Sequence, residues 1–131
     1  KEFKVYSTVT PGSRPRRGRF DAQDRLWFAE YGSNGVGMLD PKSGKIQEWT
    51  LPIPWSAPYH VTPDKNGEVW IGSMWTDRVT RLDPKTSQFT DYLLPRETNI
   101  RRVFVDNSTT PVTFWVGSNH GASILKLEPV D

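Results

Sequence analysis

Two neighbouring side chains in this sequence are candidates for acid–base chemistry. His60 follows Tyr59 at the start of a short segment of alternating apolar and polar residues. An imidazole at this place could remove a proton next to a carbonyl group, with Tyr59 or an arginine polarising the carbonyl oxygen. We therefore take His60 and Tyr59 as the candidate catalytic residues. The competing interpretation is that His60 is a hydrogen-bonded structural histidine.

Arginines and aromatic side chains form a second group of candidates, for ligand recognition. A guanidinium group pairs with a carboxylate and stacks on aromatic rings, so the combination favours a small anionic or planar ligand. The candidate ligand-binding residues are Arg16, Arg17, Arg101, Arg102, Trp55, Trp75 and His120. The alternatives are that the arginines only solubilise the surface, and that His120 only shapes its Asn-His-Gly turn.

Glu30 is the candidate metal ligand, with Mg²⁺ as the metal considered. A single carboxylate is a weak basis for such a site, because Mg²⁺ and Ca²⁺ prefer several oxygen ligands. The sequence has no cysteine, so it has neither thiolate metal sites nor disulfide bonds. It also contains no Ser-His-Asp spacing, Walker loop or dinucleotide-binding fingerprint. Mg²⁺ is therefore the one cofactor that these residues leave open, and no other cofactor is predicted.

These candidates are carried by a sequence repeat. The segments LWFAE, VWIGS and FWVGS each precede a second apolar run that ends in Asp-Pro or Glu-Pro. The repeated positions are Trp27, Trp70 and Trp115; Asp40, Asp83 and Glu128; and Tyr6, Trp49 and Tyr92. The first two sets are spaced 43 and 45 residues apart, and the third set 43 and 43. A period of about 40–45 residues is typical of β-propeller blades.

The repeat predicts an all-β fold with four antiparallel strands in each propeller blade. We expect an outer strand (Phe3–Tyr6) and a loop in residues 1–15, blades in residues 16–58 and 59–100, and a partial blade in residues 101–131. The repeated tryptophans Trp27, Trp49, Trp70 and Trp115 should form the core between blades. About three blades leave unpaired strand edges, whereas propellers have about four to eight blades. The chain should therefore be a segment of a larger ring or half of an oligomeric ring, and not a stable monomer.

The loops of a propeller alternate between its two faces, so the order of the strands places the candidates. The starts of the inner strands carry the arginine pairs, Tyr59 and His60, and they open on one face. The loops with Trp55, Trp75 and His120 open on that same face. The opposite face receives ordinary Asp-, Lys- and Gly-containing turns. One basic, aromatic rim is thus the predicted site.

Composition limits the other classes of function. The 131 residues (15.0 kDa) carry a net charge of +2, which gives no indication of nucleic-acid binding. No run of 18 apolar residues occurs, so no membrane partner is predicted. The chain starts at Lys1 without an initiator methionine, and we expect it to be a piece of a longer polypeptide. A periplasmic or secreted location is favoured over a cytoplasmic one.

The pattern of the repeat resembles the virginiamycin B lyase (streptogramin lyase) family. The shared features are a Pro at the inner strand, Asp-x-x-Gly, LWF-x-E, a run to Asp-Pro, and an aromatic strand ending in Leu-Pro. The resemblance implies a seven-bladed propeller that opens a cyclic lactone by elimination with Mg²⁺. In that family a histidine follows the inner-strand Pro of two blades. The matching positions here hold Arg16, Tyr59 and Arg101.

The preferred function is therefore a ligand-binding propeller segment, with lactone-opening carbon–oxygen lyase activity only in the complete ring. The alternative is a non-catalytic scaffold propeller that binds a partner protein through its rim. In both cases self-association, or the remainder of a longer chain, would close the ring.

Overall fold

The computed structural model describes residues 1–130, which form eleven β-strands. The strands are β1 (Pro15–Phe20), β2 (Leu26–Glu30), β3 (Gly35–Leu39), β4 (Ile46–Thr50), β5 (Pro58–Pro63), β6 (Val69–Ser73), β7 (Arg78–Asp83), β8 (Gln88–Leu93), β9 (Val103–Asp106), β10 (Thr113–Ser118) and β11 (Ser123–Leu127). Within the same residues, no helix is long and apolar enough to cross a membrane.

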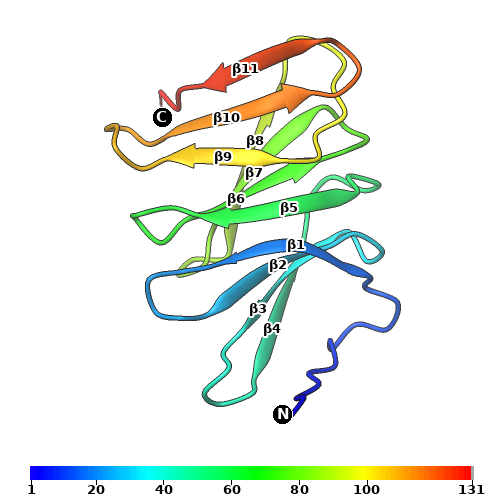
Figure 1. Ribbon diagram of the computed structural model, residues 1–131. Helices are drawn as coiled ribbons and strands as arrows, with labels where there is room; N and C mark the ends of the chain where they lie inside the picture. Colours follow the sequence, from blue (N-terminus) through cyan, green and yellow to red (C-terminus); the bar gives the residue numbers. More distant parts are fainter. Residues whose placement is uncertain (131) are drawn as a thin grey trace.

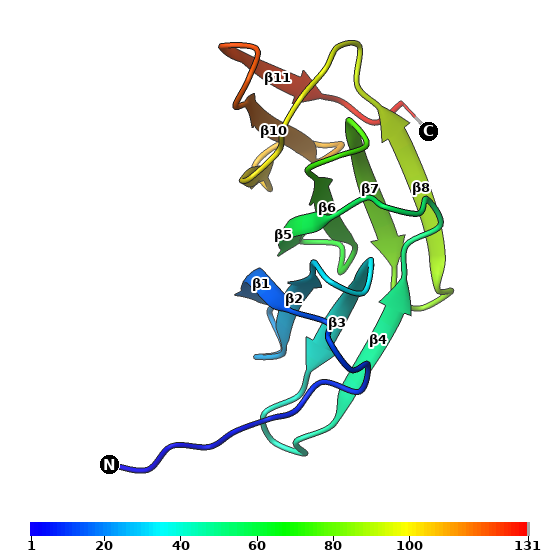
Figure 2. The same cartoon turned by 90° about the vertical axis from the view of Figure 1, so that its right-hand side faces the viewer.

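The strands form three antiparallel blades, in agreement with the all-β propeller prediction. Blade 1 has the strand order β4-β3-β2-β1, blade 2 has β5-β6-β7-β8, and blade 3 has β11-β10-β9. The inner strands β1, β5 and β9 lie side by side (Figure 1), and β4 and β8 lie at the outer side (Figure 2). The chain termini are at opposite ends of this row of blades.

Stacked aromatic rings fill the space between the blades. Between blades 1 and 2, Trp27 stacks on Trp49 with ring centroids 5.3 Å apart, and Val61 and Ile71 pack against them. Between blades 2 and 3, the Trp70 ring lies 5.9 Å from Tyr92 and 5.2 Å from Phe114. Each of these layers joins two blades, so burial of Trp27, Trp49 and Trp70 holds neighbouring blades together.

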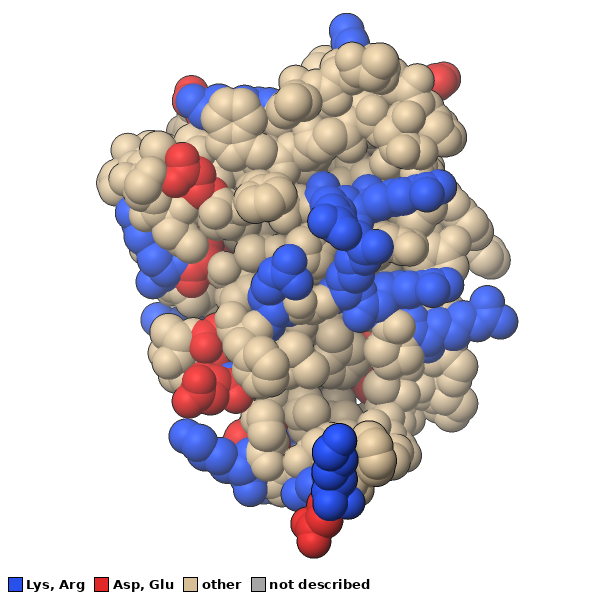
Figure 3. Space-filling view, viewed as in Figure 1, with Lys and Arg blue, Asp and Glu red and all other residues tan. Residues whose placement is uncertain are grey.

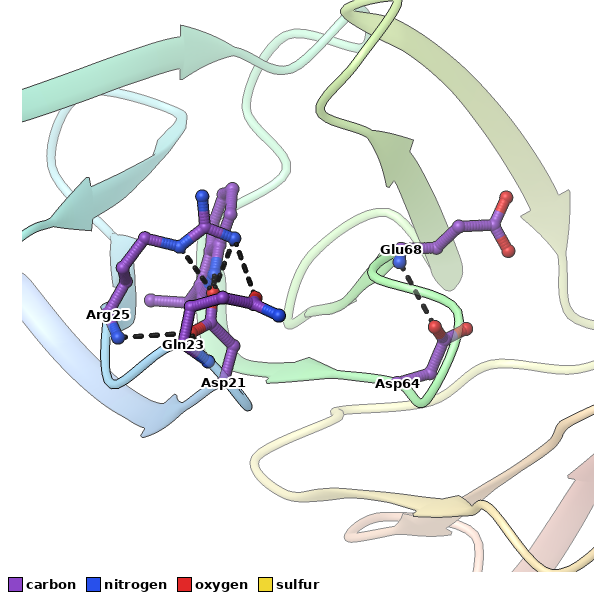
Figure 4. Close-up of polar contacts among 6 residues, drawn as sticks. Asp21, Gln23, Arg25, Asp64 and Glu68 are labelled. Atoms are coloured by element: carbon purple, nitrogen blue, oxygen red, sulfur yellow. Dashed lines mark hydrogen bonds and ion pairs between the residues drawn. The ribbon is translucent and has the colours of Figure 1, made fainter.

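An aspartate in the turn after each of the first two inner strands holds the tryptophan of its blade. Figure 4 shows the turn contacts of these aspartates, from Asp21 to Gln23 and Arg25 and from Asp64 to Glu68. Oδ2 of Asp64 accepts the Trp70 indole N–H at 2.9 Å, and its Oδ1 accepts the backbone N–H of Asn66 and Glu68. Asp21 binds Trp27 in the same way at 2.9 Å. This arrangement explains the Asp-x-x-Gly and Asp-x-x-Asp turns, because the carboxylate satisfies turn donors and a buried indole together.

Two sequence predictions are corrected at the ends of the chain. Residues 1–14 form no strand, although we expected one at Phe3–Tyr6, and Phe3 is 95% exposed. Trp115 is 38% exposed, whereas Trp27 and Trp70 are each 1% exposed. Both differences have one cause, because an outer strand needs an adjacent strand edge and an inter-blade tryptophan needs a following blade. In blade 3 the inner strand also begins at Val103, two residues later than expected.

Candidate functional site

The starts of the inner strands bring the predicted arginines to one side of the molecule. The pairing of β1 with β5 puts Arg17 beside His60. Figure 3 shows Lys and Arg side chains gathered over the inner strands, whereas most of the visible Asp and Glu side chains lie toward the left edge. The inner-strand surface is therefore basic although the chain has a net charge of only +2.

A hollow of about 460 Å³ lies on this basic surface. Its lining residues are Arg17, Tyr59, Asn99, Arg101, Arg102, Gly117, Ser118 and Asn119. Nε of Arg101 donates a hydrogen bond to Asn99 Oδ1 at 3.0 Å, which fixes one guanidinium at the edge of the hollow. Three arginines from two blades thus surround an open space that suits an anionic group. We call it the arginine hollow.

Tyr59 forms one wall of the arginine hollow and lies beside two guanidinium groups. The guanidinium carbons of Arg16 and Arg17 each lie 5.6 Å from the centroid of the Tyr59 ring. Arg16 also lies 4.9 Å from the Tyr31 ring, and Tyr31 meets Tyr59 edge to face at 6.1 Å. Stacking on aromatic rings orients both guanidinium groups without neutralising their charge.

A second hollow of about 450 Å³ adjoins this group of rings. Its lining residues are Arg14, Tyr31, Gly32, Ser33, Asn34, Pro54, Trp55, Ala57 and Trp75. Trp55 is 78% exposed and Trp75 is 60% exposed, and Trp75 meets Tyr31 edge to face at 6.0 Å. Two indoles and a phenol therefore present aromatic surface to one space. We call it the tryptophan hollow.

The backbone around the tryptophan hollow is strained. Trp55 has a φ of +59°, which is unfavourable for a bulky side chain, and Asn34 and Ala57 also have positive φ. Hydrogen bonds hold this conformation: Asn34 Nδ2 donates to Ile53 O at 2.9 Å, and Asn34 Oδ1 accepts the N–H of Ser56 at 2.9 Å. The loop is thus fixed so that the Trp55 side chain faces solvent. Strain of this kind concentrates at binding sites.

His60 is buried at the interface between blades 2 and 3, with only 3% of its surface exposed. Its Nδ1 accepts the backbone N–H of Val103 at 3.0 Å. Burial, together with the positive charges of Arg19, Arg17 and Arg102, lowers the pKa of His60 to about 4. The ring is therefore neutral at pH 7 and carries its proton on Nε2, so neither nitrogen offers a free lone pair. The role of His60 as a base stays a prediction that this geometry disfavours.

Glu30 is the last residue of β2 and lines neither hollow. It is 2% exposed, Ser33 donates to its Oε2 at 3.1 Å, and its Oε1 has no hydrogen-bond partner in residues 1–130. Burial, and then the nearby Glu48 carboxylate, raises the pKa of Glu30 to about 7. No group of three or more His, Cys, Asp or Glu residues in the described chain could hold a metal ion. The two carboxylates do not fit Mg²⁺, so metal binding at Glu30 stays an untested prediction.

The structure thus groups most of the predicted ligand-binding residues but not all of them. Trp55 and Trp75 share the tryptophan hollow, whereas Arg16 and the exposed His120 line neither hollow. Sequence reasoning missed Tyr31 and Asn99. Tyr31 directly follows the second strand of blade 1. This position could have identified it from the sequence, because a side chain there reaches the rim.

The comparisons with known proteins agree with the repeat. The sequence profile of the virginiamycin B lyase family matches residues 1–129. The chain belongs to this family. Among curated proteins, none matches the sequence.

Solved lyase structures share the fold of this virginiamycin B lyase family member. Virginiamycin B lyase from Staphylococcus aureus aligns with a TM-score of 0.76 at 24% identity, covering 94% of this chain and 44% of that protein. A catalytically inactive variant of the S. aureus lyase with quinupristin aligns with a TM-score of 0.78 at 24% identity, covering 95% of this chain and 44% of that protein. A streptogramin B lyase aligns with a TM-score of 0.73 at 19% identity, covering 96% of this chain and 44% of that protein. The chain therefore spans less than half the length of these lyases, and identities this low show the fold alone.

Proposed function

We propose that this chain binds a small ligand carrying both an anionic group and a planar apolar group. The observation that carries the proposal is that the two hollows are adjacent, separated by one pair of touching aromatic rings. Tyr59 lines the arginine hollow, Tyr31 lines the tryptophan hollow, and the two rings touch edge to face at 6.1 Å. One ligand can therefore occupy both spaces across this pair of rings.

Each end of such a ligand has a specific partner. Its anionic group would lie between Arg17, Arg101 and Arg102, where each charge-assisted hydrogen bond contributes roughly 1.5–3 kcal/mol. Its planar group would lie against the exposed indoles of Trp55 and Trp75. Because the Trp55 loop is already fixed by hydrogen bonds, little ordering is required on binding.

Lactone opening would belong to the complete ring, and the likeness of the fold to the solved lyases supports this extension. In that reaction a base removes a proton next to a carbonyl group, the ring C–O bond breaks, and the oxygen leaves as a carboxylate. The groups of this chain would bind the charged oxygen atoms, through Tyr59 and the neighbouring guanidinium groups. The base would come from other blades, since the lone pair of His60 Nδ1 accepts the Val103 N–H and Nε2 carries the proton of the neutral ring. No step is assigned to Mg²⁺, because the carboxylates present do not fit it.

The location of the protein stays a prediction. An extracellular domain from B. thetaiotaomicron has a similar fold, with a TM-score of 0.57 at 13% identity. That likeness supports a periplasmic or secreted location.

A scaffold that binds a partner protein is the second candidate function, and the exposed Trp55 and Trp75 favour it. Calorimetric titration with 2-naphthoate and with neutral 2-naphthol separates the two functions. The ligand proposal predicts saturable binding of naphthoate that is at least about tenfold tighter than binding of naphthol, which corresponds to about 1.4 kcal/mol. Equal affinity for both compounds, or binding of neither, would contradict it.

A further inference from the structure

A third hollow opens between blades 1 and 2, on the face opposite to the arginine and tryptophan hollows. Its volume is about 410 Å³. The turns between β1 and β2 and between β7 and β8 contribute to it, whereas the other two hollows are formed at the opposite ends of the strands. Because blades 1 and 2 each have four strands, both walls of this hollow are complete. We call it the inter-blade pocket.

The equivalent groove between blades 2 and 3 is occupied by a side chain of the protein itself. The guanidinium carbon of Arg81 lies 5.5 Å from the centroid of the Trp70 ring and 5.7 Å from that of the Tyr92 ring. Arg81 Nε also lies 3.6 Å from Glu68 Oε1, with which it forms an ion pair. A planar cation therefore covers the aromatic pair of blade 2 and is paired with a carboxylate of the same blade.

The two corresponding positions of blade 1 hold different side chains. Met38 lies opposite Trp27 in the strand pairing, which is the place that Arg81 holds in blade 2. Arg25 holds the place of Glu68, since each stands two residues before the tryptophan of its blade. Blade 1 thus has an uncharged side chain in place of the guanidinium and a cation in place of the carboxylate. The charge that would complement this wall is therefore negative.

Arg25 is fixed at the pocket by its neighbours. Its Nε and Nη2 lie 2.8 and 2.7 Å from Asp21 Oδ2, and Nη2 donates to Gln23 Oε1 at 3.1 Å. Asp21 also accepts the indole N–H of Trp27, so the guanidinium is tied to the core of blade 1. In Figure 4 the remaining nitrogen of the guanidinium points away from these partners. None of these contacts within residues 1–130 uses that atom, Nη1, which can therefore donate to a ligand.

A second cation lines the pocket from blade 2. Lys85 lies in the turn between β7 and β8, toward the outer side of the pocket, whereas Arg25 directly precedes β2, toward its inner side. Lys65 also lines the pocket, but its Nζ donates to Thr109 O of blade 3 at 2.7 Å. Among the described residues, those that line the pocket include no Asp or Glu. Cations on the two walls favour a ligand with two negative groups.

The apolar part of the pocket is rigid and offers little aromatic surface. It consists mainly of Met38 and the stacked Trp27 and Trp49 rings, and these two tryptophans are only 1% and 9% exposed. Trp49 donates its indole N–H to Ser87 Oγ at 3.0 Å, and this bond joins blade 1 to the turn that carries Lys85. The walls are thus held together before a ligand binds, which limits the cost of ordering. A short aliphatic chain suits this space better than a fused aromatic ring.

We propose that the inter-blade pocket binds a short aliphatic dicarboxylate, with one carboxylate on Arg25 and the other on Lys85. A carboxylate is planar and negatively charged, so it is the charge-reversed counterpart of the Arg81 guanidinium in the next groove. Gln47 and Asn66 also line the pocket and supply amide donors for the other carboxylate oxygens. This site is separate from the two hollows of the proposed function and does not depend on them.

NMR titration of the chain with succinate locates the site. The indole N–H signals of Trp27 and Trp49, which line the pocket, should shift in a saturable way, whereas those of Trp55 and Trp75 in the tryptophan hollow should not. Succinamate, in which an amide replaces one carboxylate, is the matched probe and should bind about threefold more weakly, because it loses the ion pair with an exposed lysine. Equal affinity for both compounds, no saturable shift, or shifts confined to Trp55 and Trp75 would overturn the proposal.

Variants of the pocket test its residues. Arg25→Glu with Met38→Arg copies the groove between blades 2 and 3, so it should fill the pocket and weaken succinate binding at least about tenfold. Lys85→Gln should weaken it about threefold, whereas Lys42→Gln, in an exposed turn outside the pocket, should not. Succinate binding that survives the double variant, or equal effects of the two lysine variants, would overturn the proposal. Naphthoate affinity should stay unchanged in all three variants, so the two binding proposals can fail separately.

Discussion

The Nδ1 atom of His60 lies 3.0 Å from the backbone nitrogen of Val103 and accepts its hydrogen bond. This bond joins the inner strands of blades 2 and 3 at the level of the arginine hollow. It requires a neutral imidazole, because a protonated ring has no acceptor. The protonation of His60 is therefore coupled to the contact between two blades.

The first prediction is a pH-dependent stability caused by His60. Its pKa is lowered from 6.5 to about 4 in the folded state, so between these values the unfolded chain binds more protons. Stability from this residue is full above pH 6.5 and is lost as the pH falls toward 4, by roughly 3 kcal/mol. Urea unfolding of His60→Asn, which keeps an acceptor but does not titrate, should lack this loss. An unchanged pH profile in the variant would contradict the assignment.

The second prediction concerns Glu30, whose effect on the pH dependence of stability is opposite to that of His60. Its pKa is raised from 4.5 to about 7, so the folded state binds more protons in this range and loses stability as the pH rises. Glu30→Gln mimics the neutral form and should stabilise the chain at pH 8 by up to roughly 3 kcal/mol. Because the two residues nearly cancel between pH 4.5 and 6.5, stability of the Glu30→Gln variant should rise with pH there. A destabilised variant at pH 8 would contradict the prediction.

Burial of the repeated tryptophans gives the third prediction. Trp70 is 1% exposed, stacks on Phe114 and Tyr92, and donates to Asp64, so Trp70→Ala should cost about 3–5 kcal/mol. Trp75, which is 60% exposed, provides the control, and Trp75→Ala should change the free energy of unfolding by less than about 1 kcal/mol. Equal costs in thermal or urea unfolding would mean that Trp70 does not join the blades.

These tryptophans also show how far the sequence predicts the fold. The period that aligns Trp27, Trp70 and Trp115 predicts the strands and their order, because each blade is stabilised by the same local pattern. It does not predict that Trp115 is partly exposed, since its burial depends on a following blade. The strand expected at Phe3–Tyr6 does not form for a related reason, since an outer strand needs an adjacent strand edge to pair with.

The candidate site was predictable to a smaller extent. Strand alternation groups the arginines with Tyr59, because equivalent positions of neighbouring inner strands lie side by side. The bond between His60 and Val103 and the positive φ of Trp55 were not predictable, because both depend on contacts between loops or blades rather than on the period.

The fourth prediction tests the arginine hollow. Arg101→Gln with Arg102→Gln keeps hydrogen-bond donors but removes two charges, so naphthoate should bind at least about tenfold more weakly. The dependence of its affinity on salt should fall as well, because screening acts on the charges that are removed. Lys85→Gln, in an exposed turn away from both hollows, is the control for net charge. Unchanged affinity and salt dependence in the double variant would show that these arginines only solubilise the surface.

The fifth prediction separates stability from binding at Trp55. Its φ of +59° is strained for tryptophan but open to glycine, and the side chain is 78% exposed, so little packing is lost on removing it. Trp55→Gly should therefore leave the free energy of unfolding unchanged within about 1 kcal/mol, because relief of strain offsets the greater entropy of the unfolded chain.

The matched variant is Trp55→Ala, which removes the indole but keeps a Cβ at the strained position. It should be less stable than Trp55→Gly by about 1 kcal/mol, whereas both variants should lose naphthoate affinity by the same factor, about tenfold. Urea unfolding and calorimetric titration of the two proteins measure these quantities. Binding that follows stability rather than the presence of the indole would mean that Trp55 shapes the loop and does not contact the ligand. Equal loss of binding in two variants of different stability would assign the strained conformation to ligand recognition, since the fold gains nothing from holding Trp55 there.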